Sequence, residues 1–395
     1  MNTLVKNQKL AASVRAAAPV KNFVKKPLML VLAGVALSAA AAPSFATNWW
    51  STTPQNVQGP TTIEVRSKGA LGNGVHDDTA AFQAAINALP ASGGTVHVSA
   101  GHYMIDATKT IKMRSHTRLL MDNGATLEVI PNSAERYRMI QLWKVTDVRI
   151  VGGNLVGDRA KHKGSTGEWG FGIYMAGATN TVVKAVKVSN FWGDGIWIGG
   201  AGSTRTHDLV RSENVTVISV ASSNNRRQGL SIGPAQHVYV VNSAFGNSNG
   251  AKPEAGIDIE PQTQGPANAI RLEHNTFSGS RGNGIEMHDN ISDVTITRNT
   301  ITKNYGFGVY GSSSPSITMT ANSMTQNGLA AVAVSGKSHD WSITGNTLKY
   351  NSTRYSSPTS TGGSLARDLQ IGTGTYAISV SNNVYSNAKY NTYTH

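Results

Sequence analysis

The feature that most constrains this chain is a short repeated unit: a glycine followed by an apolar, a variable and an apolar residue. The unit begins at Gly172, Gly195, Gly229, Gly256 and Gly284, with looser copies at Gly308 and Ala331. Successive starts lie 23 to 34 residues apart, so the short steps define a minimal repeat and the long ones carry loops. Apolar residues two apart form strands with one inward face. Each repeat can bury that face only by stacking on the next, which predicts a solenoid.

Asparagines repeat in phase with these units. One column contains Asn275, Asn299, Asn322, Asn346 and Asn383, and a second contains Asn304, Asn327, Asn351 and Asn387. An asparagine at the same corner of every coil can hydrogen-bond to the coils above and below, and so provide partners for buried turn backbone. We therefore expect these columns to be structural.

The region before the repeats predicts a lid for the stack. Asp77-Asp78-Thr79 precedes apolar residues at helical spacing over 80–89, which indicates a helix capped by aspartate. The segment 93–98 is then expected to begin the first strands. A solenoid end exposes unpaired strand edges, and this helix would cover them. We expect one domain over 47–395, with the cap at 60–103 and the coils at about 104–387.

Residues 1–46 have the pattern of a secretory signal peptide. Six lysines and arginines with no acidic residue precede an apolar run from Pro27 to Ala42, and Ser44-Phe45-Ala46 supplies small residues for cleavage. The run is short and alanine-rich for a membrane span, so we expect no stable membrane insertion after cleavage. The mature protein, beginning near Thr47, is expected to be secreted or periplasmic.

The remaining chain is moderately basic and lacks cysteine. Without the signal it has 29 Lys and Arg against 22 Asp and Glu, a net charge of +7. This balance favours a polysaccharide partner that is acidic. Nucleic acid is not expected, because the basic residues are scattered and no binding motif is present. The absence of cysteine excludes disulfides and thiolate metal sites.

Several amino-terminal motifs resemble one known family. Segments 69–74, 77–79, 93–96 and 101–103, together with the Gly-rich turn 152–158, resemble the signature of the pectate-lyase-like superfamily. That group includes polygalacturonase-type hydrolases, mannuronan epimerases and phage depolymerases. The resemblance implies an all-β, single-stranded right-handed parallel β-helix with an amino-terminal capping helix. It does not imply one reaction, because this fold hosts several.

The stacking brings chemically active side chains into one stripe. The second residue after each glycine should point outward, which gives the column Tyr174, Trp197, Ser231, Asp258, Glu286 and Tyr310 at a spacing of ~4.8 Å. Flanking columns and loops add further residues. The expected catalytic residues are Asp194, Asp258, Glu260, Glu286 and His288, and the expected substrate-binding residues are Tyr174, Trp197, Arg226, Arg227, Gln228, Tyr310 and Glu168. Rings stack on sugars, and carboxylates move protons.

The leading interpretation is a polysaccharide-cleaving glycoside hydrolase that uses a carboxylate pair and needs no cofactor. The polygalacturonase motifs Asn-Thr-Asp, Gly-His-Gly and Arg-Ile-Lys are absent, so pectin is not assigned as the substrate.

Two other interpretations remain open. A uronate lyase or C5-epimerase would use arginine or a cation to neutralise the substrate carboxylate, with His288 or Tyr310 as base. Asp258, Glu260 and Glu286 resemble a hard-cation site that calcium would suit. The epimerases' Asp-Pro-His-Glu is absent, and Asp258-Ile259-Glu260-Pro261 stands in a comparable place. The third interpretation is a non-catalytic glycan-binding surface protein.

Overall fold

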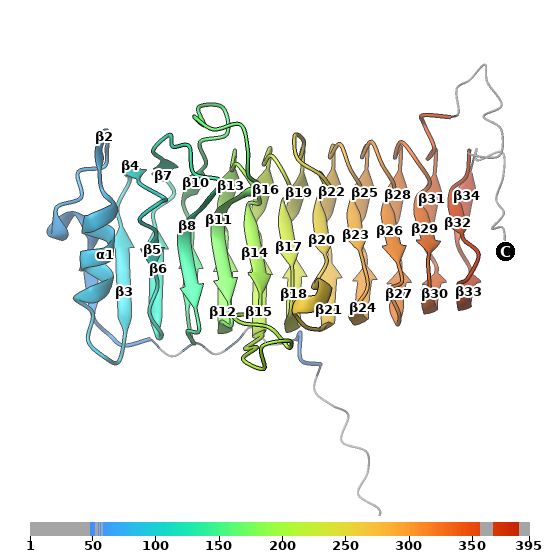
Figure 1. The fold of residues 1–395 in the computed structure, drawn as a ribbon, viewed down its shortest axis with the longest axis horizontal. Helices are drawn as coiled ribbons and strands as arrows, with labels where there is room; N and C mark the ends of the chain where they lie inside the picture. The colour runs from blue at the N-terminus through green and yellow to red at the C-terminus, as the bar shows by residue number, and fades with distance from the viewer. Residues whose placement is uncertain (1–47, 52–53, 55, 57, 356–365, 387–395) are drawn as a thin grey trace, which may run out of the picture. The chain divides into compact units, whose positions relative to one another are not determined.

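The computed structural model describes residues 48–51, 54, 56, 58–355 and 366–386. The predicted signal peptide lies outside these residues. From Thr62 onward the chain coils through three parallel sheets (Figure 1). Each coil contributes one strand to each sheet, except that the first coil and the last described one have no strand in sheet C. Sheets A and B each have 12 strands and sheet C has 10. The predicted parallel β-helix is therefore confirmed.

The strands are short, and those of one sheet recur once per coil. Sheet A contains β1 (Thr62–Glu64), β3 (Gly94–Val98), β6 (Thr117–Met121), β9 (Arg149–Val151), β12 (Thr179–Lys184), β15 (Ser212–Ile218), β18 (Ala235–Val241), β21 (Ala267–Glu273), β24 (Ile291–Thr297), β27 (Ile317–Thr320), β30 (His339–Thr344) and β33 (Tyr376–Ser381). Sheet B contains β2 (Asn73–Asp77), β4 (Gly101–Ile105), β7 (Ala125–Val129), β10 (Asn154–Val156), β13 (Lys187–Ser189), β16 (Ala221–Ser223), β19 (Ala244–Gly246), β22 (Thr276–Ser278), β25 (Thr300–Thr302), β28 (Ser323–Thr325), β31 (Thr347–Lys349) and β34 (Val384–Ser386). Sheet C contains β5 (Ile111–Lys112), β8 (Arg136–Trp143), β11 (Trp169–Ala176), β14 (Ile196–Gly199), β17 (Leu230–Ile232), β20 (Ile257–Ile259), β23 (Ile285–Met287), β26 (Val309–Ser312), β29 (Val332–Ser335) and β32 (Leu369–Ile371).

The amino-terminal end differs in two details from the sequence expectation. Strands β1 and β2 already pair with β3 and β4, so stacking starts inside the segment predicted as the cap. Helix α1 (Thr79–Asn87) forms as predicted and buries Phe82 and Ile86 against the core, but the side chain of Asp78 does not cap it. Asp78 instead accepts hydrogen bonds from the backbone N–H groups of Leu71 and Gly72. The N–H of Thr79 goes to Asp77, so the neighbouring aspartate meets the helix start.

The core is the stacked interior of the coils. Apolar residues at the same strand position in successive coils lie above one another, as Ile196, Leu230 and Ile257 do in sheet C. Each of these side chains is fully buried. Stacking therefore supplies the buried apolar area that no single coil could supply.

Both asparagine columns form the predicted ladders. In the first, the Nδ2 of Asn322 donates to Asn346 Oδ1 (2.8 Å) and to the carbonyl of Ile296 (2.8 Å), and its Oδ1 accepts from Asn299. The pattern repeats from Asn275 to Asn383. Asn387 lies outside the described residues. In the second column Asn351 instead donates to Asp368 Oδ1 (2.9 Å), so an aspartate ends the described part of that ladder.

The burial of Asp368 should make the stability of the folded protein depend on pH. Asp368 is fully buried and its Oδ2 has no hydrogen-bond partner among the described residues, and burial raises the pKa of its carboxyl to about 6. The folded protein therefore holds this proton more tightly than the unfolded chain, so stability falls as pH rises from ~4 to ~6 and stays lower above that window. We expect Asp368→Asn, which keeps the acceptor for Asn351, to stabilise the protein at pH 7 by up to about 3 kcal/mol. Urea unfolding at pH 4 and pH 7 measures the difference between wild type and variant. An equal difference at both pH values would contradict this account.

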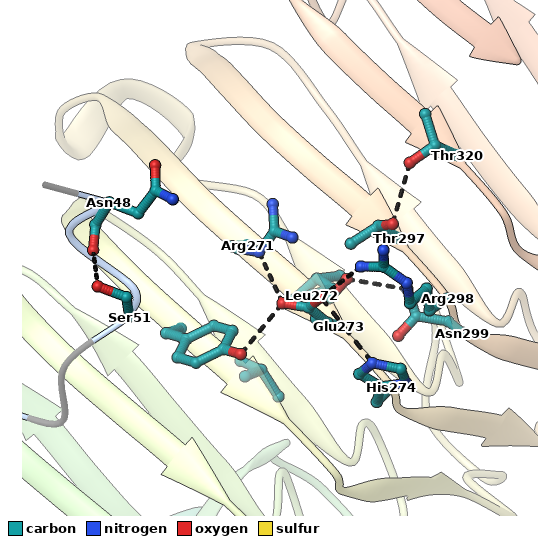
Figure 2. A network of polar contacts seen from close by, with 12 residues as sticks. Asn48, Ser51, Arg271, Leu272, Glu273, His274, Thr297, Arg298, Asn299 and Thr320 are labelled. Carbon is teal, nitrogen blue, oxygen red and sulfur yellow. Dashed lines mark hydrogen bonds and ion pairs between the residues drawn. The ribbon is translucent and has the colours of Figure 1, made fainter. Parts of the chain in front are cut away.

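The outer face of sheet A carries an ion-pair network that ties neighbouring coils together (Figure 2). Glu273 on β21 accepts from Arg271 (2.8 Å), from Tyr239 on β18 (3.1 Å) and from Arg298 beyond β24 (2.9 Å). The hydrogen bond with Arg271 lowers the pKa of Glu273, and the same carboxylate, with burial, raises the pKa of Tyr239 to about 12. No buried polar side-chain atom of Glu273 or of these three partners lacks a hydrogen bond among the described residues, which indicates a structural role.

Candidate active site

The register of sheet C determines which side chains meet on the outer face. Positions that pair on adjacent strands form one column, which contains Tyr174, Trp197, Ser231, Asp258, Glu286 and Tyr310. The predicted phase of the coils therefore holds, and Asp258 and Glu286 lie on adjacent strands. The middle of the column is more enclosed than expected, because Ser231 and Asp258 are 5% and 2% exposed.

A pocket of about 180 Å³ opens over this part of the column. Its walls include three expected catalytic residues, Asp194, Asp258 and Glu260, together with Arg227 and Trp197. Concave sites that combine a few polar groups with aromatic walls are typical of ligand-binding sites. The pocket is therefore the candidate active site.

Asp194 is held in place by a cation and a hydroxyl. It lies just before β14, fully buried, with Arg227 Nη1 at 3.2 Å from Oδ2 and Ser231 Oγ donating to the same oxygen at 2.8 Å. Burial raises the pKa of Asp194, while the positive charge of Arg227 and the Ser231 hydrogen bond oppose that rise. Arg227 also donates to Gln228 Oε1 (2.6 Å), so the guanidinium fixes two side chains at once.

Asp258 has a different environment. Its Oδ2 accepts from Gln228 Nε2 (2.6 Å), and its Oδ1 is buried without a hydrogen-bond partner among the described residues. No lysine or arginine in the described chain forms an ion pair with it. Burial raises the pKa of Asp258 well above its usual range, and the negative charge of Glu286 raises it further. The two buried carboxyl groups of the pocket are thus held differently. Asp194 forms an ion pair with Arg227, whereas Asp258 feels the charges of Arg227 and His288 but forms no ion pair with a lysine or arginine of the described chain.

Glu286 and His288 form a pair on the next coil. Glu286 Oε1 lies 3.0 Å from His288 Nε2, and its Oε2 accepts from Asn283 Nδ2 at 3.0 Å. The hydrogen bond between Glu286 and His288 raises the pKa of His288 to about 8. One ligand atom each from Asp258, Glu260 and His288 lie within 4.8 Å of one another. The group that could hold a cation therefore contains His288, whereas the sequence suggested Glu286 as its third member.

Aromatic rings and cations cover the neighbouring strands. The rings of Tyr174 and Trp197 stack with centroids 4.5 Å apart, and Arg138 on β8 lies over Tyr174 at 4.2 Å. Arg136 lies over Trp169 in the same way at 4.6 Å. Neither arginine has a carboxylate ion-pair partner among the described residues. This part of the groove therefore presents both a sugar-stacking surface and positive charge.

The other expected binding residues divide between the groove and its rims. Tyr310 stacks on Phe307 with centroids 5.5 Å apart, at the far end of the column. Glu168 lies on the rim, 3.7 Å from Arg227 Nε. Arg226, by contrast, packs over Trp192 at 3.9 Å and donates to the carbonyl of Gly167. It anchors the rim loop and does not reach the carboxylates.

Several residues that line the pocket were not named as site residues from the sequence, and Phe171 and Gln264 are two of them. Phe171 lines the pocket from the position just before Gly172, and Gln264 lines it from the loop after β20. The signal for Phe171 was present, because the position before the glycine is also that of Asp194 and Gln228. Gln264, in the 3-10 helix η2 (Gln262–Gln264), donates to the carbonyls of Gly200 (2.9 Å) and Gly202 (2.8 Å) and so joins two rim loops. That contact between distant loops has no local sequence signal.

The chain matches the family model described as "Right handed beta helix region" over residues 171–348 and 214–394. It is 30% identical to the uncharacterized protein YclG of Bacillus subtilis over 275 residues, covering 61% of this chain and 46% of that protein. It is 50% identical to mannuronan C5-epimerase AlgE2 of Azotobacter vinelandii over 60 residues, 13% of this chain and 6% of the epimerase. The chain thus spans less than half the length of these curated relatives.

Solved structures show the same architecture. The A-module of mannuronan C-5 epimerase AlgE6 of Azotobacter vinelandii superposes with a TM-score of 0.61 at 19% identity, covering 82% of this chain and 99% of that one. The surface adhesin PfbA of Streptococcus pneumoniae gives 0.65 at 17% identity, with coverages of 84% and 99%. The family 28 exopolygalacturonase of Yersinia enterocolitica gives 0.53 at 15% identity, with coverages of 85% and 77%. At these identities the likeness establishes the fold. Within the described residues, no helix has the length and apolar character needed to cross a membrane.

Proposed function

We propose that this chain, which belongs to the right-handed beta helix family, is a polysaccharide-cleaving glycoside hydrolase whose active site is the sheet C pocket. The observation that carries the proposal is the pair of buried carboxyl groups, Asp194 and Asp258, on the wall of one pocket lined by aromatic rings. Hydrolysis of a glycosidic bond needs two such groups in different protonation states. Their different partners supply that difference.

The partners assign the roles. Asp194 faces the guanidinium of Arg227 and is the group stabilised as a carboxylate, so it acts as the base that activates water. Asp258 forms no ion pair with a lysine or arginine of the described chain, and burial raises its pKa well above the usual range, so it acts as the acid that protonates the leaving oxygen. Ser231 and Gln228 lie between the two carboxyl groups, and the two strands that carry the acids are two coils apart, a spacing of ~10 Å.

The substrate is proposed to be an acidic polysaccharide outside the cytoplasm. Arg136 and Arg138 offer positive charge beside the rings of Trp169 and Tyr174, and the first 46 residues have the pattern of an export signal. An extended polymer would lie along the column of sheet C, with its sugars on the Tyr174–Trp197 stack and the bond to be cleaved over the acids.

The stacked pair predicts a specific binding defect. We expect Trp197→Ala to raise KM about 3–10-fold with a smaller effect on kcat, because a lost ring contact of 0.5–1.5 kcal/mol weakens binding of substrate and transition state alike. Tyr376→Ala is the matched control, because Tyr376 is an exposed ring of sheet A stacked on His339. Steady-state kinetics separates the two constants. An unchanged KM in Trp197→Ala would remove this residue from the substrate path.

The test of the function itself is incubation with a panel of acidic and neutral polysaccharides. A hydrolase releases new reducing ends without ultraviolet absorbance. A lyase gives products with a 4,5-double bond, which do absorb. Both readouts are taken on the same samples, with and without chelator. Absence of new reducing ends across the panel would contradict the hydrolase.

A uronate lyase or C5-epimerase is the second candidate, and one arrangement favours it. Arg227, or a cation held by the Asp258–Glu260–His288 group, would neutralise a substrate carboxylate. His288 lies beside Tyr310 with ring centroids 6.2 Å apart, which places two candidate bases together. A carbohydrate-binding protein without catalysis would keep the aromatic surface and would not need the buried acids.

A further inference from the structure

One oxygen of Asp258 is buried in the groove without a partner among the described residues. Asp258 is 2% exposed and its Oδ2 is taken by Gln228, while its Oδ1 has neither a hydrogen-bond donor nor an ion-pair partner among the described residues. Buried polar atoms almost always have a partner, because leaving one without costs about 1–3 kcal/mol. An atom with this character points to a ligand that supplies the partner.

Two further ligand atoms converge on the same point. Glu260 follows Asp258 by two residues, and His288 comes from the next coil, just after β23. One ligand atom from each of the three lies within 4.8 Å of the others. Two ligands bound to one ion at ~2.1 Å are separated by ~3.4 Å in tetrahedral geometry, so small side-chain rotations bring all three onto one cation.

The imidazole is oriented by a carboxylate, as metal-bound histidines usually are. His288 Nε2 pairs with Glu286 Oε1 at 3.0 Å, and Glu286 is itself held by Asn283, whose Oδ1 accepts from the backbone N–H of Phe307 at 2.7 Å. A metal-ligating histidine typically donates its other ring N–H to such a carboxylate, which fixes its tautomer. A cation bound by this ring would therefore use Nδ1.

The local charge also favours a cation. Asp258, Glu260 and Glu286 lie together, and within the described part of the chain none of them pairs with a lysine or arginine. Carboxylates in such a cluster repel one another, and a divalent ion removes that repulsion.

We propose that Asp258, Glu260 and His288 bind one divalent transition-metal ion, of the zinc or manganese class. The nitrogen ligand decides the class, because imidazole suits these metals whereas calcium takes six to eight oxygens. The inference goes beyond the proposed hydrolase, because a bound metal ion would also regulate its activity. A cation and a proton compete for Asp258, so metal binding inhibits a hydrolase that uses this residue as its acid.

Isothermal titration of the chelator-treated protein with zinc chloride, manganese chloride and calcium chloride tests the site. We expect one site for zinc or manganese that is much tighter than any for calcium. His288→Gln and Glu260→Gln each remove a ligand and should lower the affinity for zinc or manganese by roughly 100-fold or more. Glu286→Gln removes the orienting carboxylate and should lower that affinity about 10–100-fold. His339→Gln is the matched control, because His339 forms a comparable pair with Asp340 (2.7 Å) on sheet A. Thermal unfolding of each variant without metal checks the fold.

Three results would overturn the site: no uptake of zinc or manganese, equal uptake by wild type and both ligand variants, or calcium binding alone. The outcome is independent of the hydrolase. Metal binding lost in the variants without turnover of any polysaccharide would retain the site and remove the proposed function. Turnover of a polysaccharide without metal binding would remove the metal site and retain the proposed function.

Discussion

Asp258→Asn protein should lose about 10²–10⁴-fold in kcat, the usual contribution of a general acid, while retaining polysaccharide affinity. The amide keeps the size of the side chain and can still accept from Gln228 Nε2, but it has no proton to give the leaving oxygen. Asp194→Asn should lose a similar factor, because the neutral amide beside Arg227 cannot activate water. Kinetics on the substrate found in the panel, with binding measured separately, gives both quantities.

The control is Asp340→Asn, a change of the same kind at an exposed position of strand β30 in sheet A. It should leave kcat unaltered. Because Asp194 and Asp258 act in one reaction, the double variant should be little worse than either single one. Turnover preserved in Asp258→Asn would contradict the role of Asp258 as the acid. Binding of a polysaccharide by wild type and variant alike, without turnover by either, would favour the carbohydrate-binding protein.

Asn322→Ala should destabilise the protein by about 3–5 kcal/mol, which is large for a substitution that opens only a small cavity. The side chain of Asn322 accepts from the backbone and side chain of Asn299 and donates to Ile296 and Asn346. Alanine leaves these buried groups without partners, on both sides of the coil. Urea unfolding measures the loss.

Two further variants locate the origin of that loss. Thr318→Ala removes an exposed side chain from strand β27 of the same coil and should cost less than about 0.5 kcal/mol. Asn383→Ala, in the part-buried copy of the column near its carboxyl-terminal end, should cost less than Asn322→Ala, because one side of the ladder has fewer buried groups to leave unpaired. Equal losses for Asn322→Ala and Thr318→Ala would show that the ladder contributes little.

The sequence was sufficient for the coil and its register because both depend on repetition. The glycine-led units place Trp197, Asp258 and Glu286 in one column by spacing alone, and the structure has them there. Strands β1 and β2 were missed because they precede the repeats and have no glycine-led unit. Asp78 was expected to cap α1 because that is the local preference, but the turn at Leu71 and Gly72 provides more N–H groups to satisfy.

The electrostatics of the site could not be predicted in the same way. Side-chain reach decides each pairing. Arg227 reaches across coils to Asp194 and Arg226 reaches the rim, whereas His288 pairs with Glu286 on its own coil. The spacing that places these residues near one another does not distinguish among the pairings. The burial of Asp258 also depends on the rim loop after β20, whose closure involves Gln264 and a loop some 60 residues earlier.

Every coil has the same height, so the distance between two groove residues depends on the number of coils between them. It does not depend on the number of residues between them in the chain. Trp197 and Asp258 are two coils apart, although 60 residues separate them in the chain, because the extra residues leave the stack as loops. Lengthening a rim loop would therefore reshape the walls while leaving the interval between ring and acid unaltered. Inserting one complete coil between them would instead shift the two by one increment of ~4.8 Å, close to the length of a single sugar.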